Sequence, residues 1–188
     1  MRMAVLLSGT GRTLDNLHDR IADGTMQGSI EVVVANVVDA LGLKKAKKYG
    51  YPVHYASTDD EINSILQDYD IELVLLAGFL KLYHPPEHLK HNVLNIHPAL
   101  IPSFCGDGFY GIHVHRIVKK KGVKVSGCTV HFANEKYDEG PIVVQKSVPV
   151  YDEDSPDDIA ERVFGAECEA YPEAINLVHD KGIESYWK

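Results

Sequence analysis

Cysteine is scarce in this sequence: there are three in 188 residues, and none has the CxxC spacing of a metal or redox motif. An odd, widely spaced set argues against a disulfide framework, so we expect reduced thiols and a cytoplasmic protein. Long apolar runs are also absent, since none approaches the roughly 18 residues that cross a bilayer. The N-terminus enters an apolar segment without a signal-peptide cleavage site. We therefore expect neither secretion nor membrane insertion.

Positive charge is in short supply. Lys and Arg total 19 against 27 Asp and Glu, which gives a formal net charge of −8. A net-negative chain gains nothing from releasing counterions on a polyphosphate backbone, so a nucleic-acid partner is disfavoured. With 45% hydrophobic and 24% charged residues, the composition is that of an ordinary globular protein. The length predicts one domain over residues 1–188.

The first half of the chain alternates short apolar runs with longer amphipathic stretches. The runs predict strands over residues 3–7, 31–35, 52–55, 72–77 and 93–96, and the stretches predict helices over 13–22, 40–49 and 59–68. This alternation predicts an α/β, Rossmann-like fold, in which a mostly parallel, twisted sheet carries helices on both faces. Ligands of such sheets bind beyond the carboxyl ends of the strands.

The pattern changes after Pro98. Residues 105–111 include three glycines and predict a loop, and residues 113–121 resume helical spacing. Strands are expected over 125–132 and 142–150, joined by a turn, so the C-terminal strands should be antiparallel. Ser155 is a plausible N-cap of a last helix that runs towards Lys181.

A glycine-rich loop, Ser8–Thr13, follows the first predicted strand and opens a helix. Glycines there let backbone N–H groups approach an anion, and the helix N-terminus adds partial positive charge. The loop is not a dinucleotide fingerprint, because Leu14 stands where the third glycine belongs, and no Gly-Lys-Ser/Thr follows as in a P-loop. It suits a single phosphate monoester, although a tight turn that binds nothing is the alternative.

Asn95 and His97 lie two residues apart in a predicted strand, so they face the same side. An amide donor beside a titratable imidazole suits a tetrahedral oxyanion and a moving proton. The turn at 137–141 carries Asp138, and a carboxylate at such a turn could reach the imidazole, fix its tautomer and raise its pKa, although the turn by itself is uninformative. A structural histidine and an ordinary turn aspartate are the alternatives.

Metal and thiol chemistry are not expected. The histidines at 97, 113, 115 and 131 have neither HExxH nor Cys/His zinc spacing. None of the three cysteines sits in a motif that activates a thiolate, so we expect no nucleophilic cysteine.

Five motifs together resemble the glycinamide ribonucleotide formyltransferase family, in order and spacing, over nearly the whole chain. They are Ser8-Gly-x-Gly, Leu76-Ala-Gly-Phe79, Asn95-Ile-His-Pro-Ala-Leu-Ile-Pro102, Gly127-Cys-Thr-Val-His131 and Asp138-Glu-Gly-Pro141. The resemblance implies transfer of a formyl group from 10-formyltetrahydrofolate to the amine of glycinamide ribonucleotide, in purine biosynthesis. It also implies small-molecule substrates, no metal, and a monomer or homodimer.

The resemblance implies a role for each matching residue. Asn95 and His97 would flank the formyl carbon, with Asp138 holding and tuning His97. Substrate contacts are expected at Gly11, Arg12, Thr13 and Glu167, and folate contacts at Leu80, Lys81, Leu82, Tyr83, Asn95, Asn134, Glu135, Lys136, Tyr137 and Asp138. His113 and His131 match histidines near the family's site.

The chain departs from the family pattern in four places. Arg12-Thr13 replaces a usual Ser-Asn pair, and we expect Arg12 to add a charge contact to phosphate. Phe164 stands where a polar substrate contact is usual. The loop 103–111 is longer than in the best-known members, and residues 57–60 supply no basic residue for the folate tail.

Other activities share this fold. A formyltransferase for an amino sugar nucleotide or for methionyl-tRNA is one alternative, and a formyltetrahydrofolate hydrolase is another. The tRNA enzyme carries an extra C-terminal domain, and the hydrolase usually has an extra N-terminal domain and a residue other than proline at the position of Pro98. A binding module without catalysis would not need Asn95, His97 and Asp138 together.

Overall fold

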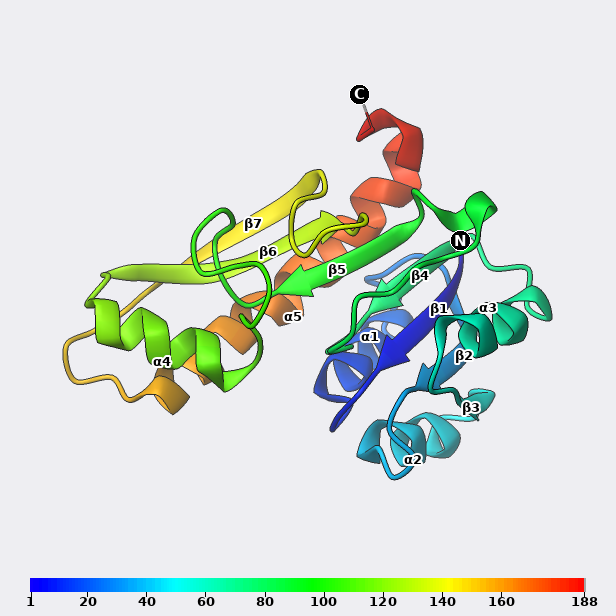
Figure 1. Ribbon diagram of the computed structural model, residues 1–188, viewed down its shortest axis with the longest axis horizontal. Helices are drawn as coiled ribbons and strands as arrows, with labels where there is room; N and C mark the ends of the chain where they lie inside the picture. The colour runs from blue at the N-terminus through cyan, green and yellow to red at the C-terminus, as the bar shows by residue number, and fades with distance from the viewer. Residues whose placement is uncertain (188) are drawn as a thin grey trace.

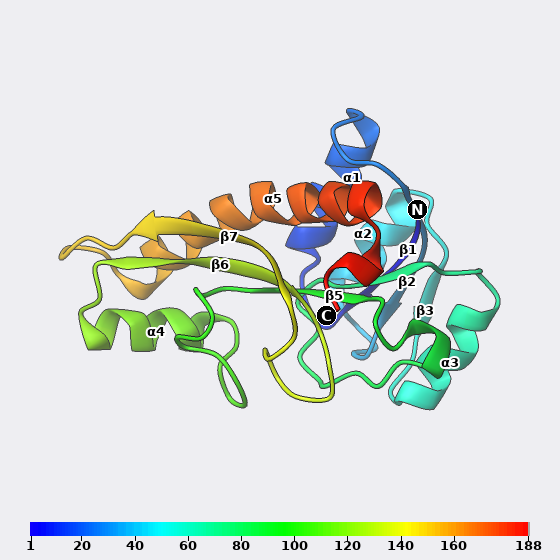
Figure 2. The same ribbon diagram turned by 90° about the horizontal axis from the view of Figure 1, so that it is seen from above.

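The computed structural model describes residues 1–187 as one mixed sheet with helices packed against it (Figures 1 and 2). The strands are β1 (Arg2–Leu7), β2 (Ser29–Ala35), β3 (Val53–Tyr55), β4 (Leu73–Leu76), β5 (Val93–His97), β6 (Val125–Phe132) and β7 (Ile142–Pro149). The helices are α1 (Arg12–Ala22), α2 (Leu41–Lys48), α3 (Asp59–Gln67), α4 (Ile112–Lys121) and α5 (Pro156–Lys181), with short 3₁₀ turns η1 (Glu87–Leu89) and η2 (Ile183–Ser185).

The strand order is β3-β2-β1-β4-β5-β6-β7. Strands β1 to β5 pair in parallel, whereas β5 with β6 and β6 with β7 pair antiparallel. The expected α/β sheet with antiparallel C-terminal strands is therefore confirmed. Because the chain leaves β1 towards β2 on one side and returns to β4 on the other, a crevice opens beyond the carboxyl ends of β1 and β4.

Alternate side chains of the sheet belong to two separate cores. In β1, Met3, Val5 and Leu7 join the core that contains the buried residues of α1 and α5, while Ala4 and Leu6 join the core beneath α3. This period of two is what a strand buried on both faces requires. The helices thus cover both faces of the sheet, as expected (Figure 2).

The predicted element boundaries hold closely. The largest difference is at β2, which begins at Ser29 instead of residue 31. Ser155 caps α5 as expected: its hydroxyl accepts from the N–H of Asp158, whose carboxylate bonds back to the N–H of Ser155. The turns η1 and η2 were not predicted, because three residues are too few to show a period.

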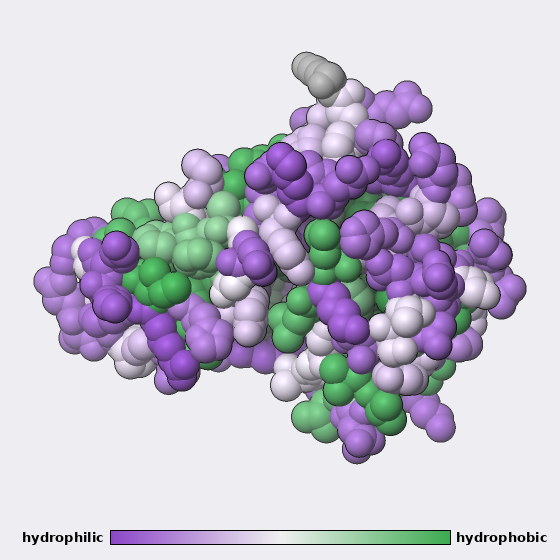
Figure 3. Space-filling view, viewed as in Figure 1, coloured by the Kyte–Doolittle hydropathy of each residue, from purple (hydrophilic) through white to green (hydrophobic). Residues whose placement is uncertain are grey.

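Two contacts hold the loops at the carboxyl edge of the sheet. The N–H of Ser8 donates to the carbonyl of Gly78 (3.1 Å), and the Ser8 hydroxyl accepts from the N–H of Leu80 (3.0 Å). The loops that follow β1 and β4 are thereby tied into one floor. In the view of Figure 3, hydrophobic residues gather in two places, in the left half over the region of β6, β7 and α4 and at the lower edge beside α2. Val37, Val38 and Leu41, before and at the start of α2, are exposed. None of the helices within residues 1–187 is both apolar enough and long enough to cross a bilayer.

Candidate active site

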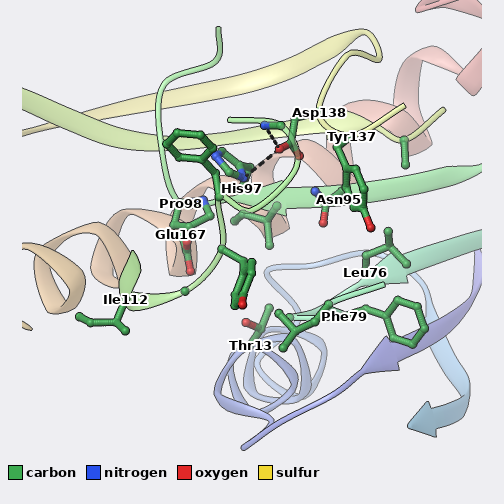
Figure 4. Close-up of a pocket in the computed structure, with 18 of the residues that line it drawn as sticks. Thr13, Leu76, Phe79, Asn95, His97, Pro98, Ile112, Tyr137, Asp138 and Glu167 are labelled. Carbon is green, nitrogen blue, oxygen red and sulfur yellow. Dashed lines mark hydrogen bonds and ion pairs between the residues drawn. The ribbon is translucent and has the colours of Figure 1, made fainter. Parts of the chain in front are cut away.

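A cavity of about 520 Å³ lies beyond the carboxyl ends of β1, β4 and β5 (Figure 4). It joins segments from the whole length of the chain: the start of α1, the loop after β4, the end of β5, the loop 103–111, the β6–β7 turn and one side of α5. The predicted site residues that line it are Arg12, Thr13, Leu80, Lys81, Leu82, Tyr83, Asn95, His97, Lys136, Tyr137, Asp138 and Glu167. The cavity therefore brings the expected catalytic, substrate and folate groups together.

Asp138 faces two imidazoles. Its Oδ2 lies 3.5 Å from Nδ1 of His97, and its Oδ1 lies 3.4 Å from Nε2 of His131. All three side chains are at least nine-tenths buried. The turn delivers the carboxylate in a left-handed backbone conformation at Asp138 (φ 60°), which aspartate tolerates better than most residues. The charge of this carboxylate is therefore poorly screened by water and acts on both rings.

The amide of Asn95 is oriented by His131, its direct partner across β5 and β6. Nδ1 of His131 is 2.9 Å from the carbonyl of Phe132, so Nδ1 carries a proton. In neutral His131, Nε2 then accepts from the amide Nδ2 of Asn95 at 3.1 Å. The second N–H of that amide has no protein partner among residues 1–187. Asn95 can therefore offer a donor to a ligand in the cavity.

His97 is held from both sides of its ring. Nε2 donates to the carbonyl of Phe104 (2.9 Å), and Nδ1 faces Asp138. Burial lowers the pKa of His97, and this outweighs the opposite effects of Asp138 and the Phe104 carbonyl. The expectation of a raised pKa is thus wrong for the ring as a whole, although the effect of Asp138 has the expected sign.

The carboxylate of Asp138 remains ionised in spite of its burial. Desolvation on its own raises the pKa, but His131, which can donate to the carboxylate through Nε2 in its protonated form, the charge of His97 and the N–H of Gly106 bring it below the ordinary value. The Gly106 N–H donates to Oδ2 at 2.8 Å. The loop 103–111 thus contacts both members of the pair, His97 through Phe104 and Asp138 through Gly106.

At the opposite end of the cavity, Gly11 precedes α1 in a left-handed conformation (φ 74°), and no side chain caps the helix. A Cβ at Gly11 would lie 2.7 Å from the Cα of Gly42, so this position requires glycine. The guanidinium of Arg12 is not free to bind a phosphate here, because it is paired with Glu161.

Glu167 also lines this end of the cavity. Burial raises the pKa of Glu167 to about 7, and the charge of Arg12 works in the opposite direction.

The expected folate side is formed by two facing loops. The N–H of Leu82 donates to the hydroxyl of Tyr137 at 3.2 Å, which joins the loop after β4 to the β6–β7 turn across the cavity. Lys81 Nζ donates to the carbonyl of Ser57 at 3.1 Å. The segment 57–60 has no basic residue of its own, but Lys81 brings a cation to it from another part of the chain.

Some predicted residues lie outside this cavity. Gly11 belongs to the loop before α1 and does not line the cavity. Asn134 and Glu135 line a neighbouring cavity of about 390 Å³. His113 contacts Tyr110 edge-to-face, with ring centres 5.4 Å apart, whereas His115 lines the cavity. The resemblance implied a place near the site for His113, whereas of these two histidines it is His115 that lines the cavity.

Three groups at the cavity were not among the predicted site residues: His115, the Phe104 carbonyl and Glu161. His115 is 4% exposed, and its Nδ1 has no partner among the described residues. Burial lowers the pKa of His115 to about 4, with a smaller contribution from His97. The Phe104 carbonyl and Glu161 were also missed, because a backbone acceptor and a single exposed glutamate leave no pattern.

The cysteines have no thiolate character. Burial raises the pKa of Cys128 to about 12 and also raises those of Cys105 and Cys168. Within residues 1–187, no cluster of three or more His, Cys, Asp and Glu is arranged to hold a metal ion. The reactive groups of this cavity are therefore an amide, imidazoles and carboxylates.

Residues 1–175 match the formyl transferase family. The chain belongs to the formyl transferase family. Several relatives carry the name phosphoribosylglycinamide formyltransferase, among them a plant protein and a bacterial one. The chloroplastic protein of Arabidopsis thaliana is 36% identical over 196 residues, which cover 97% of this chain and 67% of that protein. The Escherichia coli protein is 34% identical over 191 residues, which cover 96% of this chain and 88% of that protein.

A solved structure gives the same grouping. The glycinamide ribonucleotide transformylase 1 of Symbiobacterium toebii is 36% identical and superposes with a TM-score of 0.88, over 96% of this chain and 88% of that one. A likeness of this extent confirms the formyltransferase fold expected from the five motifs.

Proposed function

We propose that this protein transfers the formyl group of 10-formyltetrahydrofolate to the amine of glycinamide ribonucleotide. The single observation that carries the proposal is the meeting of Asn95, His97 and Asp138 in one cavity whose other end is the glycine loop before α1. Membership of the formyl transferase family and the names of the relatives support it. The products are N-formylglycinamide ribonucleotide and tetrahydrofolate, a step of purine biosynthesis.

The chemistry is a direct acyl transfer. The unprotonated amine attacks the formyl carbon, and negative charge develops on the former carbonyl oxygen of a tetrahedral intermediate. The free N–H of Asn95 and an N–H of protonated His97 donate to this oxygen. Losing one such donor costs about 100- to 1000-fold in rate. The amine loses its proton, the folate nitrogen gains one, and the carbon–nitrogen bond to the carrier breaks.

His97 must exchange partners to take part. Its Nε2 donates to the Phe104 carbonyl, and its Nδ1 faces Asp138, so both ring nitrogens are engaged before substrate binds. We propose that the reacting oxygen replaces the Phe104 carbonyl as the acceptor. Asp138 stays in place and favours the imidazolium, which opposes the effect of burial on the ring.

The folate carrier fits between the two facing loops. Leu80, Leu82 and Tyr83 line one wall, and Tyr137 closes the cavity from the other side through its bond to Leu82. An apolar slot with a few backbone polar groups is the usual form of a cofactor pocket. Lys81, beside the carbonyl of Ser57, would meet the carboxylates of the folate tail.

The substrate lies at the α1 end. The backbone N–H groups of residues 11–13 would bind the phosphate, because this helix end has no side-chain cap and carries partial positive charge. Glu167 would contact the ribose hydroxyls. With a pKa of about 7, its carboxyl is present in both protonated and ionised forms at neutral pH, so it can donate as well as accept.

An acceptor panel tests the function. Purified protein is mixed with 10-formyltetrahydrofolate and, in separate reactions, glycinamide ribonucleotide, an amino sugar nucleotide or no amine, and the release of deformylated folate is followed by absorbance. We expect release only with glycinamide ribonucleotide. Release without amine would indicate a hydrolase, and release with the sugar nucleotide alone would indicate another acceptor; either result contradicts the proposal.

A further inference from the structure

Arg12 and Glu161 form a two-pronged pair at the edge of the cavity. Nη1 of Arg12 is 2.8 Å from Oε1 of Glu161, and Nη2 is 2.7 Å from Oε2. The guanidinium carbon lies 3.8 Å from the centre of the Phe164 ring, so an aromatic face supports the guanidinium plane. All three side chains line the cavity. The ring and the carboxylate therefore fix the position of the guanidinium.

The pair is open to solvent, with 46% of the Arg12 side chain and 66% of the Glu161 side chain exposed. An ion pair so exposed adds little net stability, because water screens the charges. A guanidinium fork also matches phosphate oxygens as well as it matches a carboxylate. Arg12 can therefore change its partner at small cost when a phosphate arrives.

The charges around this end of the cavity favour an exchange of partner by Arg12 when a phosphate binds. Asp157, Glu161 and Glu167 line the same end of the cavity and would repel a dianion. The other Lys and Arg residues of the lining, Lys81 and Lys136, belong to the two facing loops. Among the Lys and Arg residues that line the cavity, Arg12 is thus the one at this end, where it offsets Asp157, Glu161 and the ionised form of Glu167.

We propose that the Arg12 side chain is a gated ligand for the phosphate monoester of the substrate. Before binding, Glu161 holds the guanidinium over Phe164; on binding, the phosphate displaces the carboxylate while the ring keeps the guanidinium in place. Glu161 is then a competitor that lowers the affinity for every anion and is overcome best by a dianion. The inference rests on the proposed function in so far as the substrate carries its phosphate beside residues 11–13.

Isothermal titration calorimetry with ribose 5-phosphate, and with ribose as the uncharged probe, tests this. Arg12→Gln should weaken binding of ribose 5-phosphate by about tenfold, because one charge-assisted contact is lost. Glu161→Gln should tighten it by roughly threefold or more, because the competitor is gone. Binding of ribose should not change. The matched control is Glu173→Gln. Glu173 is also in α5, but it lies outside the cavity, and its carboxylate is 2.9 Å from Nζ of Lys146.

The signs of the two effects decide the matter. If the pair merely ties α1 to α5, the two substitutions will either change the affinity in the same direction or leave it unchanged. Either result overturns the inference. It is also overturned if neither wild type nor Glu161→Gln binds ribose 5-phosphate measurably. The acceptor panel separates the two proposals: opposite shifts without formyl transfer would sink the proposed function alone, and formyl transfer without opposite shifts would sink the gate alone.

Discussion

Asp138 Oδ2 lies 3.5 Å from Nδ1 of His97, although one residue comes from the β6–β7 turn and the other from the end of β5. Both side chains are almost completely buried. Burial on its own disfavours the imidazolium, and the carboxylate works against it. The balance between these two effects determines how much protonated His97 is present at neutral pH, and therefore the rate of any step that needs it.

Asp138→Asn should lower kcat by about 100-fold or more, because it removes the charge that favours protonated His97. The pKa of His97 should fall further, so the alkaline limb of the pH–rate profile, where protonated His97 is lost, should move to lower pH. The profile of kcat against pH checks this, with Asp152→Asn, at an exposed ion pair with Lys124, as control. An unchanged profile in the Asp138 variant would contradict the role given to the carboxylate.

The same carboxylate should make folding sensitive to acid. Its pKa in the folded protein is lower than the ordinary value of 3.8. The stability it contributes is therefore complete above about pH 3.8 and is lost as the pH falls through the folded-state pKa. The difference in unfolding free energy between wild type and Asp138→Asn should shrink as the pH falls from 5 to 2. A difference that stays constant over this range would count against an ionised buried Asp138.

Glu167→Gln should stabilise the protein at alkaline pH and have little effect near pH 4.5. The pKa of Glu167 is raised from 4.5 to about 7, so between these values the unfolded chain holds fewer protons than the folded one. Stability is therefore lost as the pH rises through this window, by on the order of 1–3 kcal/mol. Thermal unfolding at pH 4.5, 6 and 8 measures it, with the exposed Glu169→Gln as control. A Tm difference that does not vary with pH would refute the assignment.

Gly140→Ala should destabilise the fold by about 1–3 kcal/mol, because a Cβ there would overlap the carbonyl oxygen of Phe132, which also fixes the tautomer of His131. Turnover should fall with stability. Gly165→Ala is the matched control: it lies in α5 with nothing within 4 Å of an added Cβ, and should stabilise by roughly 0.5–1 kcal/mol. Chemical denaturation gives both values, and equal effects of the two substitutions would show that close packing at Gly140 is unimportant.

The sequence was sufficient to predict the strands and the α-helices along the chain, though not the two 3₁₀ turns. Strand β1 shows why: Met3 to Leu7 are all apolar, and a strand buried on both faces needs nothing else. The spacing of Asn95 and His97 along one strand likewise places two groups in one crevice without knowledge of the rest of the fold. The link to Asp138 came from a resemblance, and the structure brings the two groups together.

The remaining features depend on geometry that no local pattern carries. The partner of His97 at Phe104 requires a left-handed backbone at that residue (φ 54°), and the pairing of Asn95 with His131 requires the register of β5 against β6. The sign of the pKa shift of His97 depends on the depth of burial. Arg12 was expected to meet phosphate directly, and its exposed partner Glu161 could not be foreseen.

The most direct test of the account is the rate at which formylglycinamide ribonucleotide appears, measured by mass spectrometry for wild type and His97→Asn at equal folded concentration. We expect amine-dependent product from the wild type, and a rate at least about 100-fold lower from the variant, with circular dichroism and Tm unchanged. Near-normal product formation by His97→Asn would contradict the central claim that this imidazole, with Asn95 and Asp138, carries the transfer.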